Sequence, residues 1–201
     1  MIKGKRKIYL DADDTIMNSS LAIIEIANQK FGTDKTIDDL KDWSYETIFK
    51  NTDEFNTVSL YESDIFFETV TPNIGFCKFY EKYKNELDFI VVTLGTKKNL
   101  EKKKEWFKKT FPAITFFGIG IGEGSAFDKS ILDMYNSIQI DDRFDCVRYT
   151  NASVKMVLKN NKDFYWANQT DITNFYYMEN WDMIDESVDF ILHNQYLFFE
   201  D

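Results

Sequence analysis

Short apolar runs alternate along the chain with longer segments in which apolar residues recur every three to four positions. The runs lie at residues 7–11, 88–93, 114–117, 137–140 and 154–158 and predict strands; the run at 88–93 is typical of a strand buried on both faces of a parallel sheet. Helices are predicted at residues 19–31, 72–83, 97–110, 129–135 and 182–192. This alternation predicts an α/β fold with a Rossmann-like, doubly wound parallel sheet.

One segment interrupts the alternation. Residues 33–70 are rich in aromatic and acidic side chains, and their periodicity is broken, which indicates a small, mostly helical insertion. Together with the helix at 19–31, it would form a helical cap inserted after the first strand. We therefore expect a core formed by residues 1–18 and 71–201 and a cap formed by residues 19–70.

Composition narrows the class of protein. The chain has 201 residues, of which 44% are hydrophobic, enough for one domain with a buried core. Its apolar runs are far shorter than the roughly 20 residues that span a bilayer, so no membrane association is expected. The first residues turn from basic to acidic without the apolar stretch of a signal peptide, which favours a cytoplasmic location. The sequence leaves the oligomeric state, monomer or homodimer, open.

Charge argues against a polynucleotide partner. There are 24 Lys and Arg against 34 Asp and Glu, a net charge of −10 that opposes binding of a polyanion. Seven lysines lie between Lys97 and Lys109, but Glu101 and Glu105 interrupt them, so we interpret them as a solvated helix face. Cys77 and Cys146 are far apart and His193 is the single histidine, which excludes the usual zinc and histidine-based catalytic patterns.

Acidic residues follow two of the predicted strands. Asp11, Asp13 and Asp14 come directly after the first strand, and Asp141 and Asp142 end a later one. Ligands of open parallel sheets bind outside the carboxyl ends of the strands, so the two groups are expected to meet in one crevice. Close carboxylates repel one another, and a hard cation with oxygen ligands relieves that repulsion. The pattern predicts a Mg²⁺ site.

Two further residues suggest an anion beside this cation. Thr93 ends the strand at 88–93, and Lys129 follows a glycine-containing loop. If both face the crevice, a hydroxyl and an ammonium group are available to bind an anion, for which phosphate is the natural choice. Each residue alone is a weak indication of a phosphate site. The order of the two acidic groups, Thr93 and Lys129 along the chain is the more specific indication.

The order of these residues resembles the haloacid dehalogenase (HAD) superfamily of phosphatases. Asp11-Ala-Asp13-Asp14-Thr15 matches its DxDx(T/V) motif, and Thr93, Lys129 and the pair Asp141-Asp142 match its three later motifs. Within the superfamily the chain is most similar to the 5'(3')-deoxyribonucleotidases. Residues 64–72, 127–130, 138–145 and 180–181 resemble further segments of that family. The resemblance covers nearly the whole chain.

The resemblance implies a mechanism and a substrate. Asp11 would be the nucleophile that forms an aspartyl-phosphate, and Asp13 the general acid and base. Mg²⁺ would be held by Asp11, the Asp13 backbone carbonyl and Asp142, with Asp141 in support, while Thr93 and Lys129 bind the phosphate. The substrate would be a nucleoside monophosphate, with Trp43, Tyr61 and Phe67 as the aromatic residues of the cap nearest its base.

The chain departs from the family pattern at four positions. Asp14 stands where glycine is usual, Thr15 where valine is common, Leu94 where serine often follows the threonine, and Phe127 where some relatives have arginine. The loss of the serine hydroxyl and the arginine leaves phosphate affinity and substrate choice open. Two alternatives therefore remain: a HAD phosphatase acting on a sugar phosphate or other small metabolite, and a catalytically silent HAD-fold binding protein.

Overall fold

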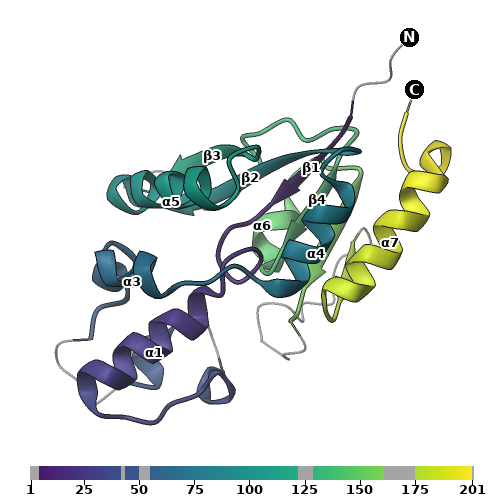
Figure 1. Cartoon of the computed structure of the whole chain (residues 1–201). Helices are drawn as coiled ribbons and strands as arrows, with labels where there is room; N and C mark the ends of the chain where they lie inside the picture. Colours follow the sequence, from purple (N-terminus) through teal and green to yellow (C-terminus); the bar gives the residue numbers. More distant parts are fainter. Residues whose placement is uncertain (1–4, 42–43, 50–54, 122–128, 161–174, 201) are drawn as a thin grey trace.

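The computed structural model describes residues 5–41, 44–49, 55–121, 129–160 and 175–200. Within these residues, six parallel strands form one sheet in the order β3-β2-β1-β4-β5-β6 (Figure 1). The strands are β1 (Arg6–Leu10), β2 (Leu87–Gly95), β3 (Thr115–Gly120), β4 (Ile138–Asp141), β5 (Val154–Leu158) and β6 (Tyr176–Met178). This is the doubly wound order, with its switch point between β1 and β4. The predicted fold class is confirmed.

The strand order explains which face each helix covers. The chain moves outward from β1 to β3, crosses to β4 and then moves the other way, and crossovers between parallel strands are right-handed. Helices α4 (Ile74–Tyr83) and α5 (Lys97–Thr110) therefore lie on one face, where α7 (Trp181–His193) packs beside α4, and the short α6 (Phe144–Arg148) lies on the other.

The two faces of the sheet are packed differently. Alternate strand residues such as Ile8 and Leu10 join Phe76, Phe79 and Trp181 in the main core. On the opposite face, Tyr9 and Val92 pack with Met134 and Ala152 in a smaller cluster. Because side chains alternate between faces along a strand, the central strands β1 and β2 carry buried apolar side chains on both faces.

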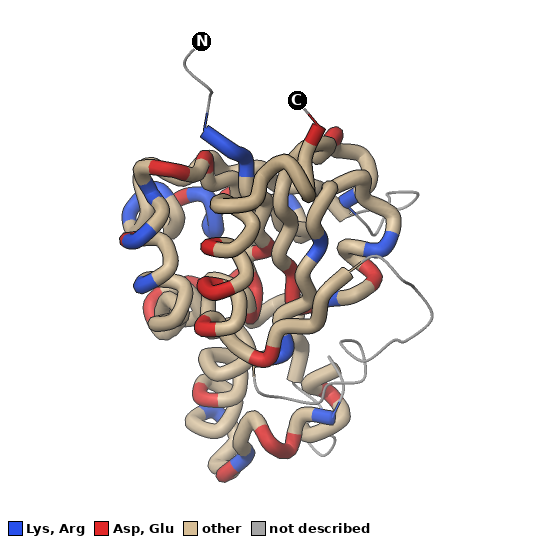
Figure 2. The backbone as a smooth tube through the Cα atoms, turned by 90° about the vertical axis from the view of Figure 1, so that its right-hand side faces the viewer, with Lys and Arg blue, Asp and Glu red and all other residues tan. Residues whose placement is uncertain are grey.

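The insertion extends from the carboxyl edge of the sheet (Figures 1 and 2). It consists of α1 (Ser19–Phe31), the 3₁₀ turns η1 (Ile37–Asp39) and η2 (Tyr45–Thr47), and helices α2 (Thr57–Tyr61) and α3 (Asp64–Thr69). Helix α1 ends at Gly32, whose left-handed backbone (φ 65°) suits glycine.

The chain leaves and re-enters the core through two segments that lie side by side. The backbone N–H of Asn18 donates to the carbonyl of Thr71 over 2.9 Å, and that of Asn73 donates to Ile16 over 2.7 Å. The side chain of Asn18 adds a 3.1 Å hydrogen bond to the Thr71 hydroxyl. The chain thus enters and leaves the insertion at neighbouring positions. The insertion also contacts α5, where the Thr96 hydroxyl donates to Glu62 over 2.5 Å and Asn99 Nδ2 donates to the Tyr61 carbonyl over 2.7 Å.

Three elements differ from the prediction. Residues 129–135 form turns and not a helix, because Asp133 accepts a hydrogen bond from the backbone N–H of Tyr135 over 3.1 Å and so stabilises a local turn. The pattern also missed α6 and β6, which have only five and three residues. A 3₁₀ turn, η4 (Gln195–Leu197), follows α7. In the described part of the chain, every helix is too short or too polar to cross a membrane.

Candidate active site

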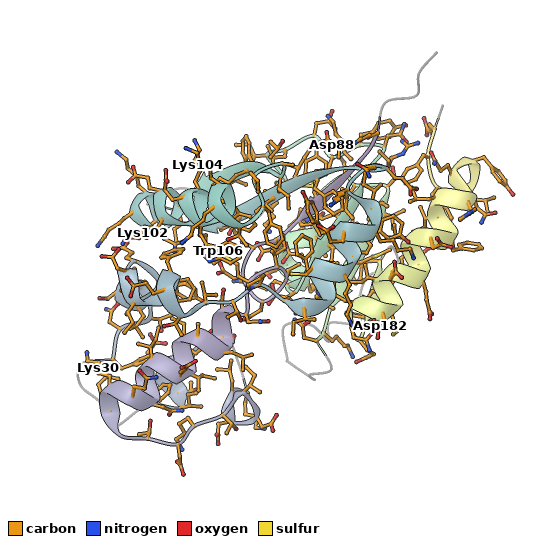
Figure 3. All side chains as sticks on the ribbon, viewed as in Figure 1. Lys30, Asp88, Lys102, Lys104, Trp106 and Asp182 are labelled. Carbon is orange, nitrogen blue, oxygen red and sulfur yellow. The ribbon has the colours of Figure 1, made fainter. Side chains whose placement is uncertain are left out.

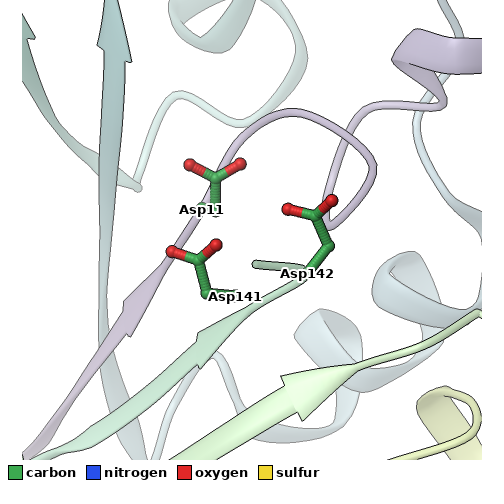
Figure 4. A group of neighbouring side chains, drawn as sticks. All are labelled: Asp11, Asp141 and Asp142. Atoms are coloured by element: carbon green, nitrogen blue, oxygen red, sulfur yellow. The ribbon is translucent and has the colours of Figure 1, made fainter. Parts of the chain in front are cut away.

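Three carboxylates meet at the switch point of the sheet. Asp11 follows β1 and Asp141 ends β4, and the backbone N–H of Asp11 donates to Ile140 over 3.0 Å, which joins the two strand ends. One oxygen from each of Asp11, Asp141 and Asp142 lies within 4.8 Å of the others (Figure 4). The structure therefore brings together acidic residues 130 positions apart in the sequence.

Lys129 lies between two of these carboxylates. Its ammonium is 2.5 Å from Asp11 Oδ1 and 2.6 Å from Asp141 Oδ2, and only 1% of its side chain is exposed. Burial alone would lower the pKa of Lys129, but Asp11 and Asp141 raise it above its usual value, so the group stays charged. The lysine predicted to bind phosphate is thus placed beside the predicted nucleophile.

The remaining negative charge suits a cation with oxygen ligands. Burial raises the pKa of Asp141 to about 7 despite the opposing effect of Lys129, and burial with the neighbouring Asp141 and Asp11 raises that of Asp142 as well. Asp141 is engaged by Lys129 and by the backbone N–H of Arg143 at 3.0 Å. A cluster of carboxylates that resists ionisation by itself fits Mg²⁺, which supplies the missing positive charge.

Asp13 is held from both sides. The hydroxyl of Ser19, the first residue of α1, donates to Asp13 Oδ1 over 2.7 Å. The ammonium of Lys103 in α5 binds Asp13 Oδ2 and also donates to Thr93 Oγ1 over 3.0 Å. The predicted general acid and the predicted phosphate ligand Thr93 therefore share one lysine.

Lys103 is the residue at this site that the sequence analysis did not single out. Of the seven lysines between Lys97 and Lys109, Lys103 alone is buried, so the predicted solvated face has one exception. It occupies the same side of α5 as the buried Asn99 and Phe107, at i−4 and i+4. That helical spacing was the available signal, and Figure 3 labels the flanking residues Lys102 and Lys104 on this helix.

Asp14 connects the loop after β1 to the insertion. Its backbone is left-handed (φ 51°), a conformation that aspartate tolerates better than most residues, at the position where the resemblance led us to expect glycine. Its carboxylate accepts hydrogen bonds from the backbone N–H of Ser20 (2.8 Å) and from the Ser20 hydroxyl, which lies 2.7 Å from Tyr45 OH. Burial raises the pKa of Asp14 to about 6. Tyr45 OH in turn lies 3.3 Å from Tyr61 OH.

The structure gives a different result for each of the three aromatic residues predicted to face the base. The ring of Tyr61 has its centroid 6.0 Å from Lys103 Nζ, which places it beside the site. Phe67 packs edge-on against Phe66 and lines a different groove, between α3 and α5, together with Lys102 and Trp106. These contacts do not bring Phe67 to the carboxylates, and its part in base binding stays a prediction. Trp43 lies outside the described residues, as does Phe127.

Comparison with known proteins agrees with this arrangement. The family model described as "5' nucleotidase, deoxy (Pyrimidine), cytosolic type C protein" matches residues 5–195. No curated protein sequence matches the chain.

Solved structures share the fold at low sequence identity. The HAD-hydrolase YfnB of Bacillus subtilis, in a magnesium-bound form, is 13% identical with a TM-score of 0.62, over 93% of this chain and 100% of that one. A haloacid dehalogenase-like hydrolase of Streptococcus pneumoniae is 14% identical with a TM-score of 0.56, over 92% and 98%. A HAD-superfamily hydrolase of Geobacter sulfurreducens is 9% identical with a TM-score of 0.53, over 93% and 96%.

Proposed function

Because the chain belongs to the family of cytosolic type C deoxy 5'-nucleotidases, an enzyme family of the phosphatase class, we propose that it is a Mg²⁺-dependent phosphomonoesterase that dephosphorylates nucleoside monophosphates. One observation carries this proposal: Asp11, Asp141, Asp142 and Lys129 converge at the switch point, with Asp13 two residues from Asp11. Fold alone would leave the function open, whereas this set of side chains supports a specific chemistry.

The residues support a reaction in two steps. In the first, a carboxylate oxygen of Asp11 forms a bond to phosphorus while the bond from phosphorus to the ester oxygen breaks, and Asp13 gives a proton to the leaving oxygen. In the second, Asp13 takes a proton from a water molecule, whose oxygen bonds to phosphorus and releases Asp11. Free phosphate and the intact enzyme result. Asp11, which is only 8% exposed, is shielded from competing solvent.

Charge complementarity assigns the other residues. Lys129, held against Asp11, and the buried Thr93 would contact the phosphate oxygens, over which the negative charge of the transition state is spread. Asp11, Asp142 and the Asp13 backbone carbonyl, with Asp141 in support, would hold Mg²⁺. Bound there, the ion would offset the repulsion between the phosphate and the aspartate nucleophile.

The first experiment measures phosphate release from a panel of nucleoside monophosphates, sugar phosphates and p-nitrophenyl phosphate. We expect the nucleotides to have the highest kcat/KM with Mg²⁺ and no activity with EDTA. Asp11→Asn should abolish turnover at an unchanged circular dichroism spectrum, since the amide is a poor nucleophile. Near wild-type turnover in Asp11→Asn would exclude the covalent mechanism. A higher kcat/KM for sugar phosphates than for nucleotides would show that the substrate is not a nucleoside monophosphate.

A further inference from the structure

We propose that Lys103 is a positioning residue for phosphoryl transfer, which fixes the carboxylate of Asp13 and directs the hydroxyl proton of Thr93 toward the substrate. The inference rests on the proposed phosphatase function. It assigns to α5 a direct part in the site, because one ammonium group contacts both side chains.

The contacts of Asp13 define its orientation. Its two carboxylate oxygens have different partners, Ser19 Oγ on Oδ1 and Lys103 Nζ on Oδ2. The first partner belongs to the insertion and the second to the core. A carboxylate tied at both oxygens has little freedom to rotate, and correct placement of a proton donor contributes strongly to rate.

The contact with Thr93 determines which atom of its hydroxyl faces the substrate. A lysine ammonium donates hydrogen bonds and accepts none, so Thr93 Oγ1 must be the acceptor in its 3.0 Å contact with Lys103. The proton of Thr93 is then available to another acceptor. Apart from Lys103, the hydroxyl has among the described residues only a long 3.5 Å contact to the Leu94 carbonyl, so an incoming phosphate oxygen is the better acceptor.

The burial of Lys103 is costly unless it serves the site. Only 1% of its side chain is exposed, whereas 27% of the side chain of Asp13 is. An ion pair with a buried lysine is weak evidence for stability, because desolvation offsets much of the attraction. The six other lysines of α5 are all at least partly exposed to solvent. Solubility therefore does not explain why a lysine occupies position 103.

The test compares leaving groups. p-Nitrophenolate leaves readily without a proton, whereas the alkoxide of a nucleoside 5'-monophosphate needs one from Asp13. General acid catalysis as a whole is worth about 10²- to 10⁴-fold, so we expect Lys103→Met to lower kcat/KM for the nucleotide by about 10- to 100-fold more than for p-nitrophenyl phosphate. Lys104→Met, which removes an exposed lysine next along the helix, is the matched control and should preserve the ratio.

A double-mutant cycle asks whether Lys103 acts through Asp13. The nucleotide kcat/KM of Lys103→Met combined with Asp13→Asn should be nearly that of Asp13→Asn alone, because residues that act as one unit are not additive. Lys103→Gln, which retains a hydrogen-bond donor, should fall between wild type and Lys103→Met and serves as the second variant if the methionine variant does not fold.

The outcomes separate the two hypotheses. If the wild-type enzyme releases no phosphate from any ester, the proposed function is wrong and the role of Lys103 falls with it. If the wild type is active but Lys103→Met and Lys103→Gln slow both substrates equally, or their effects add fully to that of Asp13→Asn, the phosphatase assignment stands and the positioning role is rejected.

Discussion

Asp141 and Asp142 are adjacent in the sequence, but their side chains have different surroundings. Asp141 is 1% exposed and is bound by Lys129 and the backbone of Arg143. Asp142 is partly exposed, and its carboxylate has no hydrogen bond to the described residues. The free oxygens of Asp142 favour a direct metal ligand, whereas those of Asp141 favour a residue that orients Lys129 and supports the ion.

This difference predicts an order of effects on Mg²⁺ affinity. Loss of a supporting partner typically costs about 10- to 100-fold in metal affinity, so we expect Asp141→Ala to raise the half-saturating Mg²⁺ concentration by about that factor. Asp142→Ala should raise it further. The measurement is phosphatase activity titrated with Mg²⁺ after treatment with EDTA. If Asp141→Ala raises the half-saturating Mg²⁺ concentration more than Asp142→Ala does, the roles of the two residues are exchanged. Ca²⁺ has longer bonds and a higher coordination number than Mg²⁺, so it should support little activity in either variant.

At the scale of elements, the sequence predicted five of the six described strands and the four long helices α1, α4, α5 and α7. It did not predict the conformation of the turns or the polar contacts of buried side chains. Strands 88–93 and 154–158 are apolar enough to specify β2 and β5 from local pattern alone. Lys103 was missed because periodicity predicts that a position faces the core but does not show which polar groups its side chain contacts there. The carboxylate positions were predictable because strand ends meet at one edge of a parallel sheet. The turns at 129–135 depend on side-chain hydrogen bonds of Asp133 and Asn151, which periodicity does not show.

Tyr61, the last residue of α2, is the predicted base-pocket residue that the structure places beside the site. Stacking of a base on an aromatic ring is worth about 1–3 kcal/mol, so Tyr61→Leu should raise KM for a nucleotide by roughly 5- to 150-fold. Turnover of p-nitrophenyl phosphate should hardly change. Phe55→Leu is the control for the packing of the insertion, because Phe55 stacks on Phe49 with ring centroids 4.8 Å apart.

The outcome also decides the role of the neighbouring aromatic residues. A selective loss of nucleotide affinity in Phe67→Leu would extend the base pocket to the groove between α3 and α5. Trp43→Leu completes the comparison. If Tyr61→Leu loses thermal stability and impairs both substrates equally, its ring serves packing and the base pocket lies elsewhere.

Across the whole molecule, the acidic site opposes folding at neutral pH. The pKa of Asp141 is raised to about 7 by burial, and those of Asp14 and Asp142 are raised as well. Below about pH 4 these groups are protonated in both the folded and the unfolded chain. Between about pH 4 and 7 the unfolded chain releases protons that the folded chain retains, so the free energy of unfolding falls as the pH rises. Ionisation of these carboxylates thus lowers the stability of the metal-free protein, and a bound cation would offset that loss.

We therefore expect the metal-free protein to have a lower Tm at pH 7.5 than at pH 5.5. A contribution on the order of a few kcal/mol corresponds to about 2–4 °C for each kcal/mol in a chain of this size. Mg²⁺ binds deprotonated carboxylates and so should raise Tm more at pH 7.5 than at pH 5.5. Thermal denaturation with EDTA or with Mg²⁺ measures both effects. In the metal-free state, the Tm of Asp141→Asn should fall less between pH 5.5 and pH 7.5 than that of the wild type. A Tm that rises with pH without metal would contradict the assignment.

The paired backbone segments around Asn18 and Thr71 have a consequence for how such enzymes diversify. Because the chain departs and returns at neighbouring positions, the sheet needs only a short bridge there, and a segment of almost any length closes the gap at small entropic cost. Evolution or an engineer can thus exchange the segment between these points while Asp11, Asp142 and Lys103 stay in the retained part of the chain. The contacts that Thr96 and Asn99 of α5 make with the insertion would have to be replaced. Ser19 and Tyr61 would be replaced in such an exchange. A transplanted module must therefore bring its own hydroxyl to Asp13 and its own surface for the leaving group.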